Sequence, residues 1–110
     1  MTDGLMFAQL TIERTDSTGE SSLVLRGELD MASCPLLADE LKAVEASGAG
    51  RVVIDLRRLE FMDSCGLHAL LEAERRCRTR GQRLSLRRGP RAVQQVFDLT
   101  QTASAFCFEG

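Results

Sequence analysis

Short apolar runs, separated by polar, glycine-containing and proline-containing segments, occur along the whole chain. The runs at 5–12 and 22–26 are joined by the polar, turn-forming stretch 16–20. Two short apolar runs connected in this way predict an antiparallel β-hairpin. Residues 27–30, with the sequence Gly-Glu-Leu-Asp, are expected to end the second strand.

The following segment has helical spacing. Ser33 is expected to cap a helix whose first turn contains Pro35, because a proline at that position loses no intrahelical hydrogen bond. Three residues at intervals of four and three form one apolar stripe: Leu37, Leu41 and Val44. The segment 47–50, which contains two glycines, is expected to end this helix.

The continuous apolar run at 51–56 predicts a strand buried on both faces, and the order strand, helix, strand predicts a parallel pair with a helical crossover. A second helix is expected between the Asp-Ser pair at 63–64 and Gly81. Its predicted inner face consists of Gly66, Leu67, Leu70, Leu71, Ala73 and Cys77. On its outer face Glu72 and Arg76 lie four apart, in the order that favours an ion pair. These features predict an α/β domain.

The remaining residues are expected to form a further strand and a further helix. Leu84 and Leu86 alternate with polar residues in a predicted strand at 82–87. The Gly-Pro pair at 89–90 is expected to open a third helix. The apolar tail at 106–108 fits either a short final helix or an edge strand, and both alternatives stay open.

Composition limits the classes of function. The chain has 110 residues, which fit one domain at 1–110, and its net charge of -2 disfavours nucleic-acid binding through a basic field. The four cysteines contain no CxxC pair and have one histidine to accompany them, so we expect reduced thiols and no zinc site. No targeting sequence or transmembrane run is evident. We therefore expect a cytoplasmic protein without membrane attachment.

Ser64 is the main candidate for chemistry. It follows Asp63, precedes the small residues Cys65 and Gly66, and lies at the start of a predicted helix. Free NH groups and the positive end of the helix dipole favour negative charge at such a position. Ser64 therefore either caps the helix or presents a hydroxyl for modification, and its small neighbours suggest that the hydroxyl is approachable.

Enzymatic alternatives have less support. A nucleophilic Ser64 assisted by His68 lacks half of the GxSxG signature and has no evident third group. Asp55 at a strand end is typical of phosphoacceptor domains, but those require a late lysine, and the lysine here is Lys42. Cys65 as a nucleophile has no evident base. No phosphate-binding glycine loop is present, so we expect no cofactor and no metal.

Three segments resemble, in order and spacing, the STAS domain of bacterial anti-sigma factor antagonists. They are 27–30 followed by Ser33, the strand 52–56, and 61–67, which contains Asp-Ser-Cys-Gly. The Asp-Ser-x-Gly element is the most specific of them. The resemblance implies a STAS-like fold, a small mixed β-sheet of about four to five strands with helices packed on one side.

The resemblance also implies a phosphorylation switch. In that family a partner that is both anti-sigma factor and serine kinase phosphorylates the serine that corresponds to Ser64. The unmodified antagonist binds this partner and frees the sigma factor, and a phosphoserine phosphatase reverses the modification. The residues implied at the binding face are Asp30, Ser33, Asp63, Ser64, Cys65 and Gly66. Cys65 stands where the family commonly has a small hydroxyl residue, which adds a site open to oxidation.

Two other functions remain open. One is a STAS scaffold or small-ligand sensor module within a larger signalling assembly, with no sigma factor involved. The other is an esterase-like hydrolase that uses Ser64 and His68.

Overall fold

The computed structural model describes residues 9–109, which form alternating strands and helices. In chain order these are β1 (Leu10–Ser17), β2 (Glu20–Leu29), α1 (Cys34–Ala46), β3 (Arg51–Met62), α2 (Ser64–Thr79), β4 (Arg83–Arg87), α3 (Arg91–Leu99), the 3-10 helix η2 (Ala103–Ala105) and β5 (Cys107–Glu109).

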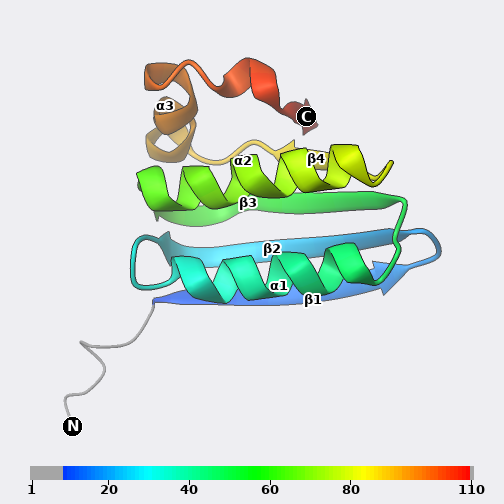
Figure 1. Cartoon of the computed structure of the whole chain (residues 1–110). Coiled ribbons are helices and arrows are strands. Elements are labelled where there is room, and N and C mark those ends of the chain that lie inside the picture. Colours follow the sequence, from blue (N-terminus) through cyan, green and yellow to red (C-terminus); the bar gives the residue numbers. More distant parts are fainter. Residues whose placement is uncertain (1–8, 110) are drawn as a thin grey trace, which may run out of the picture.

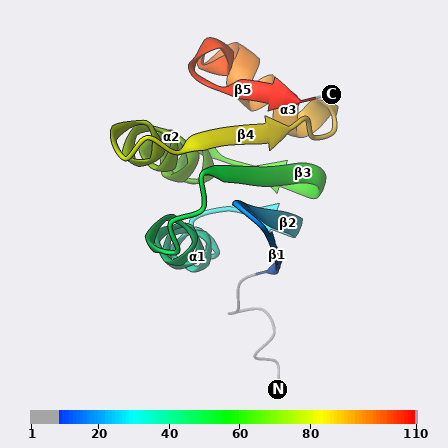
Figure 2. The same ribbon diagram turned by 90° about the vertical axis from the view of Figure 1, so that its right-hand side faces the viewer.

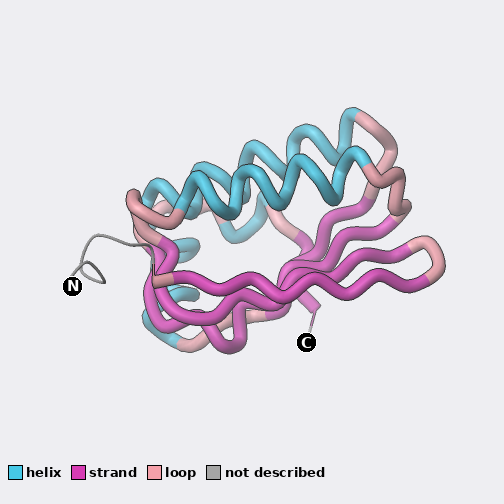
Figure 3. Tube along the Cα trace, turned by 90° about the horizontal axis from the view of Figure 1, so that it is seen from below, coloured by secondary structure: helices cyan, strands magenta, loops and turns pink. Residues whose placement is uncertain are grey.

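The strands form one sheet in the order β1-β2-β3-β4-β5. β1 pairs antiparallel with β2, and every later pair is parallel. The predicted hairpin, parallel crossover and mixed sheet are therefore confirmed. α1 and α2 lie side by side over one face of this sheet (Figure 1). α3 lies toward the opposite side, so the expectation of helices on one side holds for the two longer helices (Figures 2 and 3).

The hairpin is longer than its apolar pattern indicates. The pairing continues to Ser17 and Glu20, so the turn is shorter than the predicted stretch 16–20. Gly19 has a φ of 76° in this turn, a value that favours glycine. The polar residues of β1 stay in the ladder because their side chains are exposed on an edge strand. The predicted start of the first strand, at 5–8, lies outside the described residues.

β3 also exceeds its predicted length, and this extension leads into the Asp-Ser segment. The predicted part, 51–56, is buried on both faces after its first residue, as expected. The strand then continues through the exposed Arg57 and Arg58 to Met62, where it pairs with the end of β2. Two consecutive exposed arginines, Arg57 and Arg58, hid this extension, because they interrupt the apolar run before the buried Leu59.

The core includes the space between the sheet and the two longer helices, together with Val93 and Phe97 of α3. Leu37, Leu41 and Val44 of α1 are fully buried, which confirms the predicted stripe. In α2 the predicted inner face is buried except for Leu71, which packs partly against the core. No helix within residues 9–109 combines the length and apolar character needed to cross a membrane.

An ion pair joins α1 to α2. Arg76 Nε lies 2.7 Å from Glu45 Oε1, and Arg76 Nη2 lies 3.0 Å from Glu45 Oε2. The direct partner of Glu72 is Arg75. Hydrogen bonding from Arg75 and, to a smaller degree, the charge of Arg76 lower the pKa of Glu72, so the predicted attraction between Glu72 and Arg76 is present without a direct ion pair. Glu45 is 3% exposed, so its carboxylate gains more from a bidentate partner than the half-buried Glu72 does.

Of the two alternatives for the tail at 106–108, the structure shows the edge strand: β5 pairs parallel with β4. The short helical turn η2 precedes it. Phe97 of α3 contacts Phe106 and Phe108 edge-to-face, with ring centroids 5.3 Å and 5.2 Å apart. These rings attach the tail to α3.

Candidate functional site

The loops that follow β2 and β3 meet at one end of the sheet, where α1 and α2 begin (Figure 1). Adjacent parallel strands end at the same edge of a sheet, which brings their following loops together. The Asp63 backbone NH donates to the Leu29 carbonyl at 3.1 Å. The Cys34 thiol donates to the Cys65 carbonyl at 3.0 Å. Residues 30–34 and 63–66 therefore form one face, called the switch face below.

Asp30 and Ser33 hold the first loop of the switch face together. The Asp30 carboxylate accepts from the backbone NH groups of Ala32 and Ser33 at 3.0 Å and 3.1 Å. The Ser33 hydroxyl donates to the Glu28 carbonyl at 2.8 Å and accepts from the Asp30 NH. Ser33 occupies the position before α1, but its side chain makes no capping bond, so the predicted capping role is wrong. It is also buried, and it shapes the loop from inside.

Asp63, not Ser64, caps α2. One Asp63 carboxylate oxygen accepts from the backbone NH groups of Cys65 at 2.9 Å and Gly66 at 3.2 Å. Ser64 is the first residue of the helix and is exposed. Within the described residues its hydroxyl has no hydrogen-bond partner. Of the two predicted alternatives for Ser64, the structure shows the outward-facing hydroxyl.

The residues after Ser64 are small for different reasons. A Cβ on Gly66 would lie 2.6 Å from Leu29 Cγ and 3.0 Å from Met62 Cγ. Glycine is therefore required for α2 to approach the core, whereas the sequence suggested that its small size exposes Ser64. Cys65 is half-buried, and its carbonyl receives the Cys34 thiol.

A groove of about 730 Å³ runs between α1 and α2 and begins at the switch face. Met31, Cys34 and Pro35 line one side of it, and Ser64, Cys65 and His68 line the other. Met31 is 74% exposed, although it is a large apolar side chain. Exposed apolar side chains beside a polar group are typical of surfaces that bind another protein.

The geometry does not support the hydrolase alternative. His68 lies one turn after Ser64 on the surface of α2, with a side chain that is 74% exposed. Its Nε2 atom is 4.0 Å from Glu72 Oε2, and it has no hydrogen bond to Ser64 in the described chain. A general base must reach the hydroxyl it activates.

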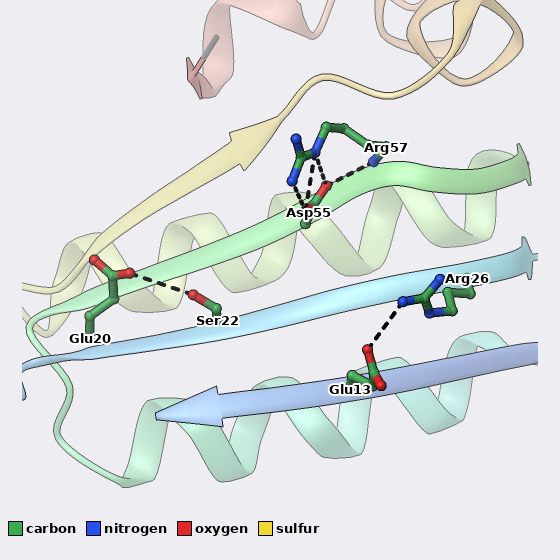
Figure 4. A network of polar contacts seen from close by, with 6 residues as sticks. All are labelled: Glu13, Glu20, Ser22, Arg26, Asp55 and Arg57. Atoms are coloured by element: carbon green, nitrogen blue, oxygen red, sulfur yellow. Dashed lines mark hydrogen bonds and ion pairs between the residues drawn. The ribbon is translucent and has the colours of Figure 1, made fainter. Parts of the chain in front are cut away.

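Asp55 forms a local ion pair on the outer face of the sheet (Figure 4). Arg57 Nη2 lies 2.8 Å from Asp55 Oδ2, and the Arg57 backbone NH donates to Asp55 Oδ1 at 3.0 Å. Hydrogen bonding from the Arg57 side chain lowers the pKa of Asp55 from its ordinary value. The predicted role of Asp55 as a strand residue with local hydrogen bonds is confirmed. Among residues 9–109, no group of three or more metal-ligating side chains converges.

Comparison with known proteins places this arrangement in a family. The family model described as "Mlab, STAS domain" matches residues 13–103. The chain belongs to the STAS domain family. BtrV of Bordetella bronchiseptica, named as an anti-sigma factor antagonist, is 32% identical over 98 residues, which cover 89% of this chain and 83% of BtrV.

Two solved structures have the same fold as this chain. An anti-sigma factor antagonist from Mycobacterium paratuberculosis superposes with a TM-score of 0.82 at 27% identity, covering 90% of this STAS chain and 84% of the other. The phosphorylated form of the Bacillus cell fate determinant SpoIIAA gives a TM-score of 0.69 at 20% identity, covering 92% and 91%. At 20% identity, the similarity to SpoIIAA shows that the two chains share a fold and nothing more.

Sequence reasoning missed two residues of the switch face in this STAS chain. Met31 is a large apolar residue inside a polar loop, and that mismatch was a signal available in the sequence. Cys34 approaches Cys65 across 31 positions of sequence, and no local pattern indicates such a contact.

Proposed function

We propose that this STAS chain is an anti-sigma factor antagonist that acts by binding, and that its switch face docks an anti-sigma factor. The main observation is the Ser64 hydroxyl, which is exposed, makes no hydrogen bond within the described residues and lies in the same groove as the exposed Met31. The names of the relatives from Bordetella and Mycobacterium support this class of partner.

The anti-sigma factor is also the kinase that phosphorylates Ser64. Phosphorylation adds about -1.5 to -2 charges at pH 7. The first turn of α2 favours negative charge, but Asp63 repels it, and Met31 offers an apolar surface. Docking would remove this new charge from water, so the phosphorylated form releases its partner. A phosphoserine phosphatase then restores binding. SpoIIAA, which shares the fold, has a phosphorylated form.

The remaining residues of the switch face have supporting roles. Asp63 takes the capping position, which leaves the Ser64 hydroxyl free for phosphate. Ser33 and Gly66 are buried, so they hold the two loops in place without presenting a side chain to the partner. Asp30 and Cys65 are half-buried and present part of their surface beside Ser64.

Phosphorylation by the cognate anti-sigma kinase tests the modification. The purified chain is incubated with the kinase and ATP, and its tryptic fragments are analysed by mass spectrometry. Fragment 59–75 contains Ser64 as its one hydroxyl-bearing residue, so phosphate on that fragment identifies the site. Ser64→Ala should remain unmodified, and the exposed control Ser104→Ala should be phosphorylated normally. Phosphate on any other fragment, or none on the unaltered chain, would contradict the assignment.

Isothermal titration calorimetry against the same kinase, without ATP, tests the release. The phosphorylated chain should bind at least about 30-fold more weakly than the unmodified chain, because a buried unpaired charge costs about 2 kcal/mol or more. Ser64→Ala should bind as the unmodified chain does, even after incubation with ATP. Equal affinities of the two forms would refute a charge-operated switch.

A second candidate is a sensor or scaffold module in a larger signalling assembly, and the groove between α1 and α2 favours it. Size-exclusion chromatography separates the two functions. A scaffold should form large complexes by itself, whereas an antagonist should elute as a small species until the anti-sigma factor is added.

A further inference from the structure

Two cysteines from distant parts of the chain lie together on the switch face. Cys34 is the first residue of α1, and Cys65 is the second residue of α2. The Cys34 sulfur is 3.0 Å from the backbone oxygen of Cys65, and both residues line the groove between the helices. Both side chains are half-buried and in the free thiol form. The Cys34 side chain is therefore in direct contact with the backbone of Cys65, and this closeness is the first requirement for a bond between the two sulfurs.

We propose that Cys34 and Cys65 form a redox modification site, at which hydrogen peroxide produces a disulfide between the first turns of α1 and α2. In the first step the Cys65 thiolate attacks one peroxide oxygen, the O–O bond breaks, and hydroxide leaves while Cys65 becomes a sulfenic acid. In the second step the Cys34 sulfur attacks the sulfenic sulfur, an S–S bond forms, and the S–O bond breaks. The Cys34 proton and the departing hydroxide leave as water.

The groups around Cys34 make it the thiol that attacks the oxidised Cys65 in the second step. Burial raises the pKa of the Cys34 thiol, and the neighbouring Cys65, Asp63 and Asp30 raise it further. A thiol that stays protonated reacts slowly with peroxide, because the thiolate is the nucleophile. It remains available to resolve an oxidised neighbour that lies within reach.

The other two cysteines are placed differently. Cys77 is fully buried, and burial raises its pKa to about 11. Cys107 is exposed on β5, at the far edge of the sheet from α1. Intramolecular oxidation should therefore join Cys34 to Cys65 specifically.

The disulfide would act on Ser64, and this step rests on the proposed function. Ser64 lies between Asp63 and Cys65, in the turn that the Asp63 carboxylate caps through the Cys65 NH. Phosphoryl transfer requires the Ser64 hydroxyl to line up with the phosphate in the kinase active site, and the turn around Ser64 must adapt to that geometry. A bond from Cys65 to α1 restrains that adaptation, so the disulfide form should accept phosphate more slowly than the reduced form.

Peroxide treatment of the purified chain tests the site without any partner. After remaining thiols are alkylated and the chain is digested with trypsin, fragments 27–42 and 59–75 should appear as one disulfide-linked species that dithiothreitol separates. Cys107→Ser should still form this species, and Cys34→Ala and Cys65→Ala should not. Sulfinic acid without the linked fragments, or linkage through Cys77 or Cys107, would overturn the proposal.

Phosphorylation of the two redox forms tests the effect on Ser64. The initial rate with the cognate kinase should fall by a factor of about five or more in the disulfide form, the ratio that corresponds to about 1 kcal/mol. Dithiothreitol treatment of the disulfide form, which breaks the link, should restore the reduced rate, and peroxide-treated Cys107→Ser should show the same fall as the original chain. Equal rates in the reduced and disulfide forms would overturn the regulatory step. Absence of phosphate on the reduced chain would instead overturn the proposed function, with the linked fragments still observed.

Discussion

Replacing Gly66 by alanine tests how much the close packing of the switch face against the core contributes to the stability of the domain. A Cβ at this position would lie 2.6 Å from Leu29 Cγ, 2.7 Å from Leu29 Cδ2 and 3.0 Å from Met62 Cγ. Leu29 is fully buried and cannot move toward solvent, and overpacking a core costs about 1–3 kcal/mol. Alanine recovers up to about 1 kcal/mol of helix propensity. The free energy of unfolding should therefore fall, by up to about 2 kcal/mol once the full recovery is subtracted.

Urea unfolding followed by circular dichroism measures this loss, and a double-mutant cycle identifies its cause. Leu29→Ala alone should cost about 2–5 kcal/mol and should leave space for the new methyl group. The double variant should then lose at least about 1 kcal/mol less than the sum of the two single losses. Additive losses, or a Gly66→Ala chain as stable as the original, would refute the packing role of Gly66.

Three further predictions concern the cap, the outer ion pair and the thiols. Asp63→Ala should lose about 1 kcal/mol of unfolding free energy, whereas Asp63→Asn, which keeps a capping oxygen, should stay close to the original in the same urea assay. Arg57 lowers the pKa of Asp55, so this pair stabilises the fold above the ordinary value of 3.8 and its contribution is lost as pH falls through the lower folded value. Asp55→Asn should flatten that acid dependence in urea unfolding at stepped pH, and an unchanged slope would contradict the assignment. Alkylation of the native chain with iodoacetamide at about pH 8 should reach exposed Cys107 first and buried Cys77 last, and mass spectrometry of the fragments records the order.

The main elements of the fold were predictable because burial imposes a period on the sequence. Leu37, Leu41 and Val44 recur with the spacing of a helix face, and all three are fully buried in α1. The run at 51–56 lacks alternation because β3 is covered on both sides there. In α1 and in the buried part of β3, the spacing of apolar residues predicted whether the segment is a helix or a strand and where it lies in the chain.

The ends of the strands were less predictable. Where a strand is exposed to solvent, its sequence loses the regular spacing of apolar residues, although its backbone stays paired with the neighbouring strand. β3 is irregular at Arg57 and then pairs with β2 again from Arg58 to Met62, and β1 stays paired with β2 to Ser17. The pairing of Arg76 with Glu45 was hidden for a related reason. The two residues are 31 positions apart, and the packing of α1 on α2 brings them together.

The roles of the two helix-start serines show what local sequence leaves undecided. Ser and Asp are both preferred capping residues, so a segment that contains one of each fits either assignment. At the first loop Ser33 bonds to the Glu28 carbonyl because the turn folds back over the end of β2. At the second loop Asp63 reaches two NH groups of α2, and Ser64 is left outside. Contacts with residues beyond the segment decide each case.

The residues of the Asp-Ser-Cys-Gly segment have separate roles, and this separation allows a charge on the surface to change binding without unfolding the domain. Asp63 caps α2 and Gly66 packs against Leu29, so both anchor the turn through contacts that do not involve the Ser64 hydroxyl. Adding phosphate to Ser64 breaks none of these contacts. The proposed phosphorylation would therefore change the charge of the switch face while the sheet and helices keep their packing. A switch built in this way acts through the partner's affinity, and its effect scales with how much of Ser64 the partner removes from water.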